Sequence, residues 1–167
     1  MVKLALDWDG PAYLRMKRPE SAPPDFEPQS LEVGKGVVRR EGGDLTIISA
    51  GLCVSEALKA AEGLAREGIN ASVVDMATLK PIDADLILER AAATGAIVTA
   101  ENHNIIGGLG SAVAEVLADA GIGLPFKRVG VQDRFCEGGT TPYLMEKFGL
   151  DATAIARVAQ DVMKRKG

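Results

Sequence analysis

Short apolar runs rich in β-branched residues alternate with stretches of helical periodicity from residue 44 onward, and this alternation constrains the fold more than any other feature. The runs cover residues 44–50, 71–75, 95–100 and 126–131. Each is apolar nearly throughout, rather than at every second position. Strands of that kind are buried on both faces, which indicates a sheet covered by helices on each side.

The segments between and after these runs have the periodicity and the end signals of helices. The expected helices cover residues 54–67, residues 81–93 with Pro81 in the first turn, residues 111–120, a short stretch from Thr140 or Thr141, and a last stretch from Asp151 to the C-terminal cations. Strands and helices in alternation predict an α/β fold. We expect a three-layer, Rossmann-like domain with a mostly parallel sheet of about five strands.

The N-terminal part of the chain differs from the rest. Four prolines fall between residues 19 and 28, so this stretch can form neither a helix nor an interior strand. We therefore expect a strand-like remnant of another domain at residues 1–18, a proline-rich linker at residues 19–33, and the α/β domain at residues 34–167.

Composition argues against several classes of function. A net charge of −4 does not favour nucleic-acid binding, and no apolar run reaches the ~18 residues of a membrane span. The first residues carry carboxylates where a signal peptide would be apolar, so a cytoplasmic location is expected. The chain has two cysteines without paired spacing and a single histidine, which predicts neither a disulfide framework nor a metal site.

Residues 101–111 hold the strongest candidate for chemistry, because they follow the end of an expected strand. Their glycines lead into a helix whose first N–H groups could hold an anion. The spacing is not that of a dinucleotide fingerprint, so we favour glycines that let the helix pack closely on the sheet. His103 could donate a proton, with Glu101 orienting it, but a structural role is favoured.

Two arginines near the linker are the second candidate. Arg15 and Arg18 carry guanidinium groups that suit phosphate oxygens, although spacing alone favours solvated side chains. Cys53 and Cys136 have no activating neighbours in sequence and are interpreted as small core residues. No nucleophile elbow, phosphate loop or telling carboxylate pair is present, so the residues alone predict no complete active site.

Several short motifs follow one another along the α/β domain. They are Gly-Lys-Gly-Val-Val (34–38), Asp-Leu-Thr-Ile-Ile-Ser-Ala-Gly (44–51), Val-Val-Asp (73–75), Leu-Lys-Pro-Ile-Asp (79–83) and Thr-Ala-Glu-Asn-His-Asn-Ile-Ile-Gly-Gly-Leu-Gly-Ser-Ala-Val (99–113). Their order over residues 34–160 resembles the C-terminal domain of transketolases, especially the small half of split bacterial and archaeal enzymes. Residues 9–19 are similar to the end of the family's pyrimidine-binding domain.

The resemblance implies a thiamine-diphosphate-dependent transferase that carries a two-carbon ketol unit between sugar phosphates. Thiamine diphosphate and a divalent metal (Mg) would bind to domains absent here, so no catalytic, cofactor-binding or metal-binding residue is carried onto this chain. The family's phosphate-binding arginine aligns best with Arg18 and next with Arg15, and Glu101 and His103 would form a possible rim. Asn102 stands where the family often has a second glutamate, which weakens a proton-transfer role for His103.

The expected partners are the cofactor-binding domains or subunit of the same enzyme, a second copy in a homodimer and a sugar-phosphate substrate. This chain alone would be inactive and would contribute structure and dimerisation. Two alternatives stay open. One is the C-terminal part of a deoxyxylulose-5-phosphate synthase or of a 2-oxo-acid dehydrogenase β subunit. The other is a stand-alone module that binds an anion or nucleotide at the helix start near residues 107–111.

Overall fold

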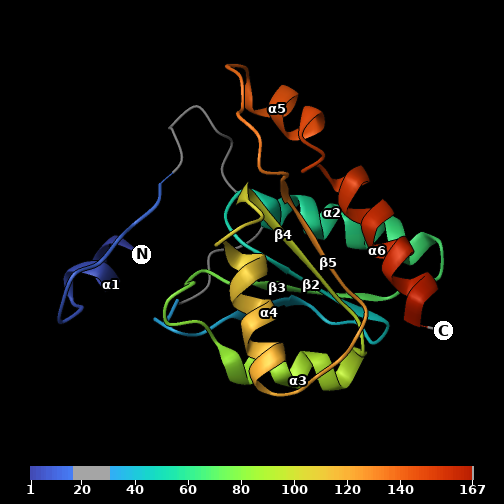
Figure 1. Cartoon of the computed structure of the whole chain (residues 1–167), viewed down its shortest axis with the longest axis horizontal. Helices are drawn as coiled ribbons and strands as arrows, with labels where there is room; N and C mark the ends of the chain where they lie inside the picture. Colours follow the sequence, from blue (N-terminus) through green and yellow to red (C-terminus); the bar gives the residue numbers. More distant parts are fainter. Residues whose placement is uncertain (17–30, 167) are drawn as a thin grey trace.

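A five-stranded sheet lies at the centre of the computed structural model, which describes residues 1–16 and 31–166 (Figure 1). Its strands are β1 (Val37–Arg40), β2 (Leu45–Ser49), β3 (Ala71–Asp75), β4 (Ile97–Asn104) and β5 (Phe126–Val131). They lie in the order β1-β3-β2-β4-β5; β2 to β5 are parallel, and β1 runs antiparallel to β3. The predicted α/β class and the mostly parallel sheet are confirmed.

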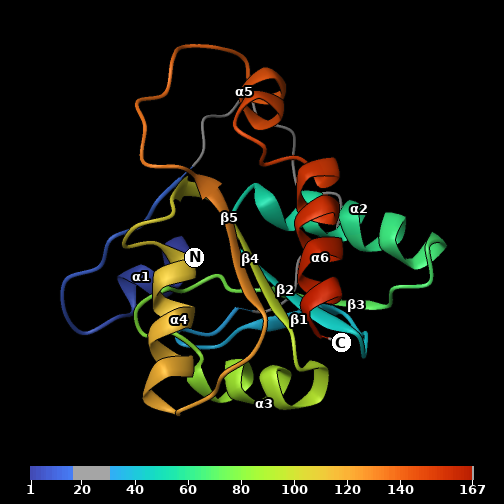
Figure 2. The same cartoon turned by 45° about the vertical axis from the view of Figure 1, so that its right-hand side comes forward.

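Helices cover both faces of the sheet (Figures 1 and 2). The helices α2 (Cys53–Arg66) and α6 (Ala152–Lys166) pack together on one face, and α3 (Ala84–Thr94) and α4 (Leu109–Asp119) pack together on the other. All residues of β2 and β3 are buried, as strands between two helical layers must be. Two short helices, α1 (Val2–Leu6) and α5 (Thr141–Lys147), have no buried residues.

Helix α3 begins later than the sequence indicates. It was expected to start at Pro81, but Asp83 caps it and the first helical residue is Ala84. One carboxylate oxygen of Asp83 accepts a hydrogen bond from the backbone N–H of Leu86 at 3.1 Å, and the other accepts one from Gly36 at 3.0 Å. The side chain therefore starts the helix and also fixes the entry to β1.

Two strand boundaries also differ from expectation. Strand β1 was not predicted, and β4 continues past residue 100 to Asn104, so residues 101–104 belong to the strand rather than to a loop. Ala100 pairs with Val129 and Asn104 pairs with Val131, so β4 advances four residues while β5 advances two. This irregularity bends the polar end of β4 out of the regular ladder.

The N-terminal segment forms the short helix α1 and then runs without regular structure through residues 11–16. Within the described residues this stretch pairs with no strand. Figure 1 shows the segment extending away from the three-layer body. Arg18 and most of the proline-rich linker fall at residues 17–30, outside the described part, so the proposed domain boundaries stay predictions.

The order of the strands fixes where a site can form. From β2 the chain passes through α2 to β3, which lies on one side of β2. It then passes through α3 to β4, which lies on the other side of β2. Open α/β sheets place ligands in the crevice beyond the carboxyl ends of strands where the order reverses in this way. Here that point lies at the ends of β2 and β4. None of the described helices is long and apolar enough to cross a bilayer.

Candidate functional site

Arg15 reaches the point where the strand order reverses. Its Nη2 donates a hydrogen bond to the backbone carbonyl of Asn102 in β4, at 2.8 Å. Gly51, which follows β2, has φ +60°, and a Cβ there would lie 3.2 Å from the Asn102 side-chain oxygen. The structure therefore places Arg15 beside the end of β4, close to the predicted residues Glu101 and His103, although Arg15 is far from them in sequence.

Glu101 occupies the start of helix α4. Its Oε2 accepts from the backbone N–H of Leu109 at 2.7 Å, and its Oε1 accepts from that of Gly110 at 2.8 Å. The side chain is only 2% exposed. A carboxylate is well placed there, because the positive end of the helix dipole and two N–H donors compensate its charge. The anion-binding helix start considered from sequence is thus filled by the protein's own carboxylate.

The glycines of this segment make room for the Glu101 cap. A Cβ on Gly108 would lie 2.0 Å from Glu101 Oε2, and one on Gly110 would lie 2.6 Å from Cδ of Arg128 and 2.8 Å from Oγ1 of Thr99. Neither position has space for a side chain. The interpretation of these glycines as a close-packing device is confirmed, and it applies most directly to Gly110 against β4 and β5.

His103 is exposed at the end of β4 and has no bond to Glu101. Its Nδ1 lies 2.9 Å from the carbonyl oxygen of Asn104, to which the protonated nitrogen donates. Both oxygens of Glu101 are engaged by α4, so Glu101 does not orient the imidazole. His103 therefore stands at the rim of the crevice without the partner that a proton-transfer role would need.

Hydrogen bonds hold the chain between β4 and α4 in place. Asn104 is central: its side-chain oxygen accepts from the Ile106 N–H at 2.8 Å, and its amide donates to Asp133 at 3.0 Å. Arg128 Nη1 donates to the Ile105 carbonyl at 2.8 Å. The loops after β4 and β5 are therefore joined to each other at the carboxyl edge of the sheet.

The two cysteines have different surroundings. Cys53 is buried at the start of α2, and burial, with the nearby carboxylates of Glu56 and Glu101, raises the pKa of its thiol to about 12. The thiol therefore stays protonated and is a poor nucleophile. Cys136 is exposed, so the expectation that both cysteines are core residues is wrong for Cys136.

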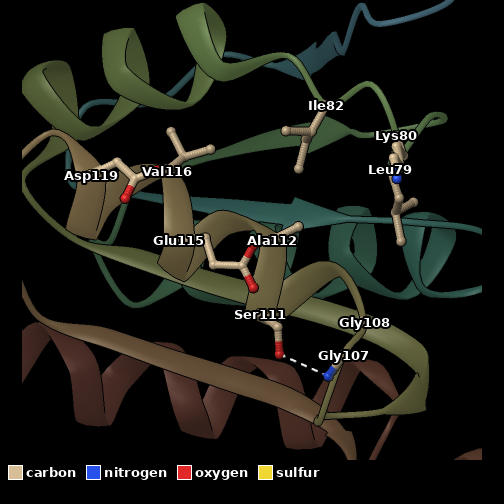
Figure 3. A pocket seen from close by; sticks show the side chains of 10 residues that line it. All are labelled: Leu79, Lys80, Ile82, Gly107, Gly108, Ser111, Ala112, Glu115, Val116 and Asp119. Atoms are coloured by element: carbon tan, nitrogen blue, oxygen red, sulfur yellow. Dashed lines mark hydrogen bonds between the residues drawn. The ribbon is translucent and has the colours of Figure 1, made fainter.

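An open groove of about 520 Å³ lies beside the same edge, between α4 and the segment before α3 (Figure 3). Leu79 and Lys80 line one side, and Gly107, Ser111 and Glu115 lie on the α4 side. The Gly107 N–H donates to Oγ of Ser111 at 2.9 Å, as the dashed line shows. This N–H group is therefore already bonded and does not point to a ligand in the groove.

Two features of the described residues bear on thiamine diphosphate and its metal. None of the described residues form a group of three or more His, Cys, Asp or Glu side chains that could hold a metal ion. The α4 start, which has the geometry for a phosphate, holds Glu101 instead. We therefore derive no catalytic step through the cofactor on this chain.

Comparison with known proteins identifies the family. The family model described as "Transketolase, C-terminal domain" matches residues 34–155. The 6-deoxy-6-sulfo-D-fructose transketolase subunit of Clostridium sp. (strain MSTE9) is 50% identical over 95% of this chain and 49% of its own length. The 1-deoxy-D-xylulose-5-phosphate synthase 1 of Geobacter sulfurreducens is 42% identical over 100% of this chain and 27% of its own length.

A solved structure agrees with these sequence matches. It is described as a split gene transketolase in an inactive beta4 tetramer, with a TM-score of 0.80 and 49% identity over 87% of this chain and 48% of that one. The chain thus spans about half the length of the split transketolase relatives, and about a quarter of the synthase. With half or more of its residues matched to the family model, this chain belongs to the transketolase C-terminal domain family.

Proposed function

We propose that this chain is the C-terminal part of a thiamine-diphosphate-dependent transketolase that transfers a two-carbon ketol unit between sugar phosphates. The observation that carries the proposal is the 50% identity to a split transketolase subunit along nearly the whole chain. That relative is about twice as long, so an equally large part of such an enzyme has no counterpart here.

In this proposal the chain has a structural role and no complete active site. The remaining domains bind thiamine diphosphate and Mg²⁺, and the cofactor supplies the carbanion chemistry. The α/β domain presents a rigid carboxyl edge, because the Glu101 cap and the Asn104–Asp133 bond fix the loops that follow β4 and β5. The assembled enzyme would be a homodimer in the cytoplasm.

Arg15 is the described residue best suited to bind the anionic end of a substrate. A guanidinium has five N–H donors, and the bond to the Asn102 carbonyl uses one of them. The other donors of this exposed side chain can meet phosphate oxygens in a planar fork. We propose that Arg15 and Arg18 bind the substrate phosphate, with His103 at the rim of the site, while the buried Glu101 supports this rim only indirectly, by capping α4.

Two relatives each suggest an alternative to the proposed reaction. The 42% identity to a 1-deoxy-D-xylulose-5-phosphate synthase supports a synthase that uses the same domain. The transketolase subunit at 50% identity is named for a donor that carries a sulfonate, 6-deoxy-6-sulfo-D-fructose. An arginine binds either anion, because its N–H groups donate to phosphate and to sulfonate oxygens alike.

Product analysis tests the proposal. The chain is combined with the remaining domains of the same enzyme, thiamine diphosphate and Mg²⁺, and supplied with an aldose phosphate acceptor. Parallel reactions receive a ketose phosphate or 6-deoxy-6-sulfo-D-fructose as donor. A further one receives pyruvate and glyceraldehyde 3-phosphate and is analysed for 1-deoxy-D-xylulose 5-phosphate, which forms when pyruvate loses CO₂ and its remaining two carbons join the aldehyde. A ketose phosphate two carbons longer than the aldose acceptor, formed together with an aldose two carbons shorter than the donor, supports transketolase. Formation of 1-deoxy-D-xylulose 5-phosphate alone would replace it with the synthase.

A further inference from the structure

We propose that the carboxyl edge of the sheet is the surface on which the cofactor-binding part of the enzyme docks. The edge surface is defined by three exposed side chains, Leu79, Ile106 and Phe135. This inference rests on the proposed function, since that function supplies the partner, but its test is one of binding and does not depend on turnover.

Large exposed apolar side chains gather at one end of the α/β domain. Within residues 31–166 they are Leu79, Ile106, Phe135 and Tyr143. Leu79 follows β3, Ile106 follows β4, and Phe135 and Tyr143 follow β5, so all four come after the carboxyl end of a strand. Phe135 is 103% exposed, and a fully solvated aromatic side chain is costly unless it meets a partner. The amino ends of the strands carry none of the four.

The loop that holds Ile106 is related to each of the other two loops. Leu79 and Gly107 line the same groove from different sides, so the loop that holds Leu79 faces the loop that holds Ile106 across it (Figure 3). The Asn104–Asp133 bond joins that second loop to the one that holds Phe135. Single apolar residues on a surface need no explanation, but a row of them on joined loops is typical of an interaction site.

The N-terminal segment indicates which partner occupies this surface. It reaches the same edge, where Arg15 binds the Asn102 carbonyl. The same segment exposes three large apolar side chains, Trp8, Tyr13 and Met16. The family model describes a C-terminal domain, and under the proposed function the cofactor-binding part is joined to it through this segment. Since Arg15 holds the segment at the edge, the partner we propose is that cofactor-binding part rather than a second copy of the α/β domain.

The chemistry of the edge surface suits such a partner. Interfaces are centred on aromatic and large aliphatic anchors, with charged residues at the rim. Phe135 supplies the aromatic anchor, and Glu137 and Lys147, which form an ion pair at 2.6 Å, lie farther along the same loop and helix α5. Truncating an anchor of this kind weakens binding by about tenfold or more, whereas changes at a rim are far smaller.

The test measures affinity between this chain and the remaining domains of the enzyme, expressed as a separate polypeptide and immobilised for biolayer interferometry. Phe135→Ser and Ile106→Ser are compared with Lys127→Ser, an exposed change at the amino end of β5. Because these side chains are exposed, the melting temperature of each variant should stay at the wild-type value. As a second measurement, a photo-crosslinking phenylalanine analogue replaces Phe135 or, as control, Gly123, where a side chain has open space.

We expect Phe135→Ser and Ile106→Ser to weaken binding by about tenfold each, Lys127→Ser to change it by less than about twofold, and crosslinks to form from position 135 but not from position 123. Unchanged binding in the edge variants, crosslinks only between copies of this chain, or no binding of the wild type would overturn the inference. Binding through the edge without ketol transfer would leave the inference standing and overturn the proposed function.

Discussion

Replacing Glu101 with glutamine should destabilise the domain strongly, although the two side chains have the same shape. The carboxylate accepts from two backbone N–H groups at the start of α4, and a glutamine has one side-chain oxygen for the two donors. Its NH₂ group would face the second N–H, which leaves a buried donor without an acceptor. The glutamine side chain also has little room to shift toward a better geometry, because the side chain at position 101 packs closely against Gly108.

Three contributions set the magnitude. A buried N–H left without an acceptor costs about 1–3 kcal/mol, and the remaining bond falls from a charge-assisted to a neutral one. Loss of the negative charge at the helix start costs a further ~0.3–2 kcal/mol. Removing a buried charge acts in the opposite direction, because the desolvation cost of Glu101 is relieved. The two donors already compensate that cost in the native state, so we expect a net loss of about 2–4 kcal/mol.

Urea unfolding followed by far-UV circular dichroism measures the effect. The matched control is Glu115→Gln, the same substitution at an exposed position on the same helix, which should change the free energy of unfolding by less than about 0.5 kcal/mol. If Glu101→Gln were no more destabilising than Glu115→Gln, the carboxylate would not be the element that holds α4 against β4, and the description of the carboxyl edge would be wrong.

Other predictions concern the core. Gly110→Ala should lower the free energy of unfolding by about 1–3 kcal/mol in the same urea titration, because its Cβ would lie 2.6 Å from a neighbouring side chain; a neutral result would contradict the close packing. Asp75→Asn should cost about 1.5–3 kcal/mol, because it replaces the charge-assisted bonds that Arg39 Nε and Nη2 donate to the carboxylate, at 3.2 and 2.9 Å, by weaker bonds to a neutral amide; a loss below about 0.5 kcal/mol would show that this pair is dispensable. Cys53 should resist iodoacetamide at pH 8 while Cys136 reacts, and equal rates by mass spectrometry would contradict the burial. Because the folded Cys53 thiol has its pKa raised from 9.0 to about 12, its contribution to stability is complete below pH 9 and is lost between these values, which a pH series with Cys53→Ala as reference measures.

The parallel strands were the easiest part of the fold to predict, although only β2 and β3 are buried throughout. The runs at residues 71–75 and 126–131 match β3 and β5 residue for residue, and the run at 44–50 exceeds β2 by one residue at each end. These runs contain the apolar residues that two helical layers demand, and glycine or polar residues bound them. The hydrophobic pattern was therefore sufficient to locate the inner strands β2 and β3.

Strand β1 gave no comparable signal. All four of its residues are half-buried, so neither an alternating pattern nor a continuous apolar run marks it. It forms because it pairs with β3, more than thirty residues farther along the chain. The end of β4 was missed for a related reason: residues 101–104 are polar, and their place in the strand depends on an irregular pairing with β5.

The candidate site depends on contacts that sequence cannot show. Glu101 was recognised as a candidate, but its role as a cap rests on backbone N–H groups eight and nine residues away. Asn102 was noted only for its side chain, whereas its backbone carbonyl binds Arg15 across 87 positions of sequence. A glutamate shortly before a glycine-rich helix start was the one available signal. It could have suggested that the helix already had an internal anion.

Ketol transfer by three samples tests the central claim most directly: this chain alone, the remaining domains alone, and the two together, each with thiamine diphosphate, Mg²⁺, a ketose phosphate donor and an aldose phosphate acceptor. The account predicts transfer only in the mixture, with a rate that saturates as this chain is added. Transfer by this chain alone would show that it holds a complete site. No transfer in a mixture that demonstrably assembles would show that the enzyme is not a transketolase of sugar phosphates.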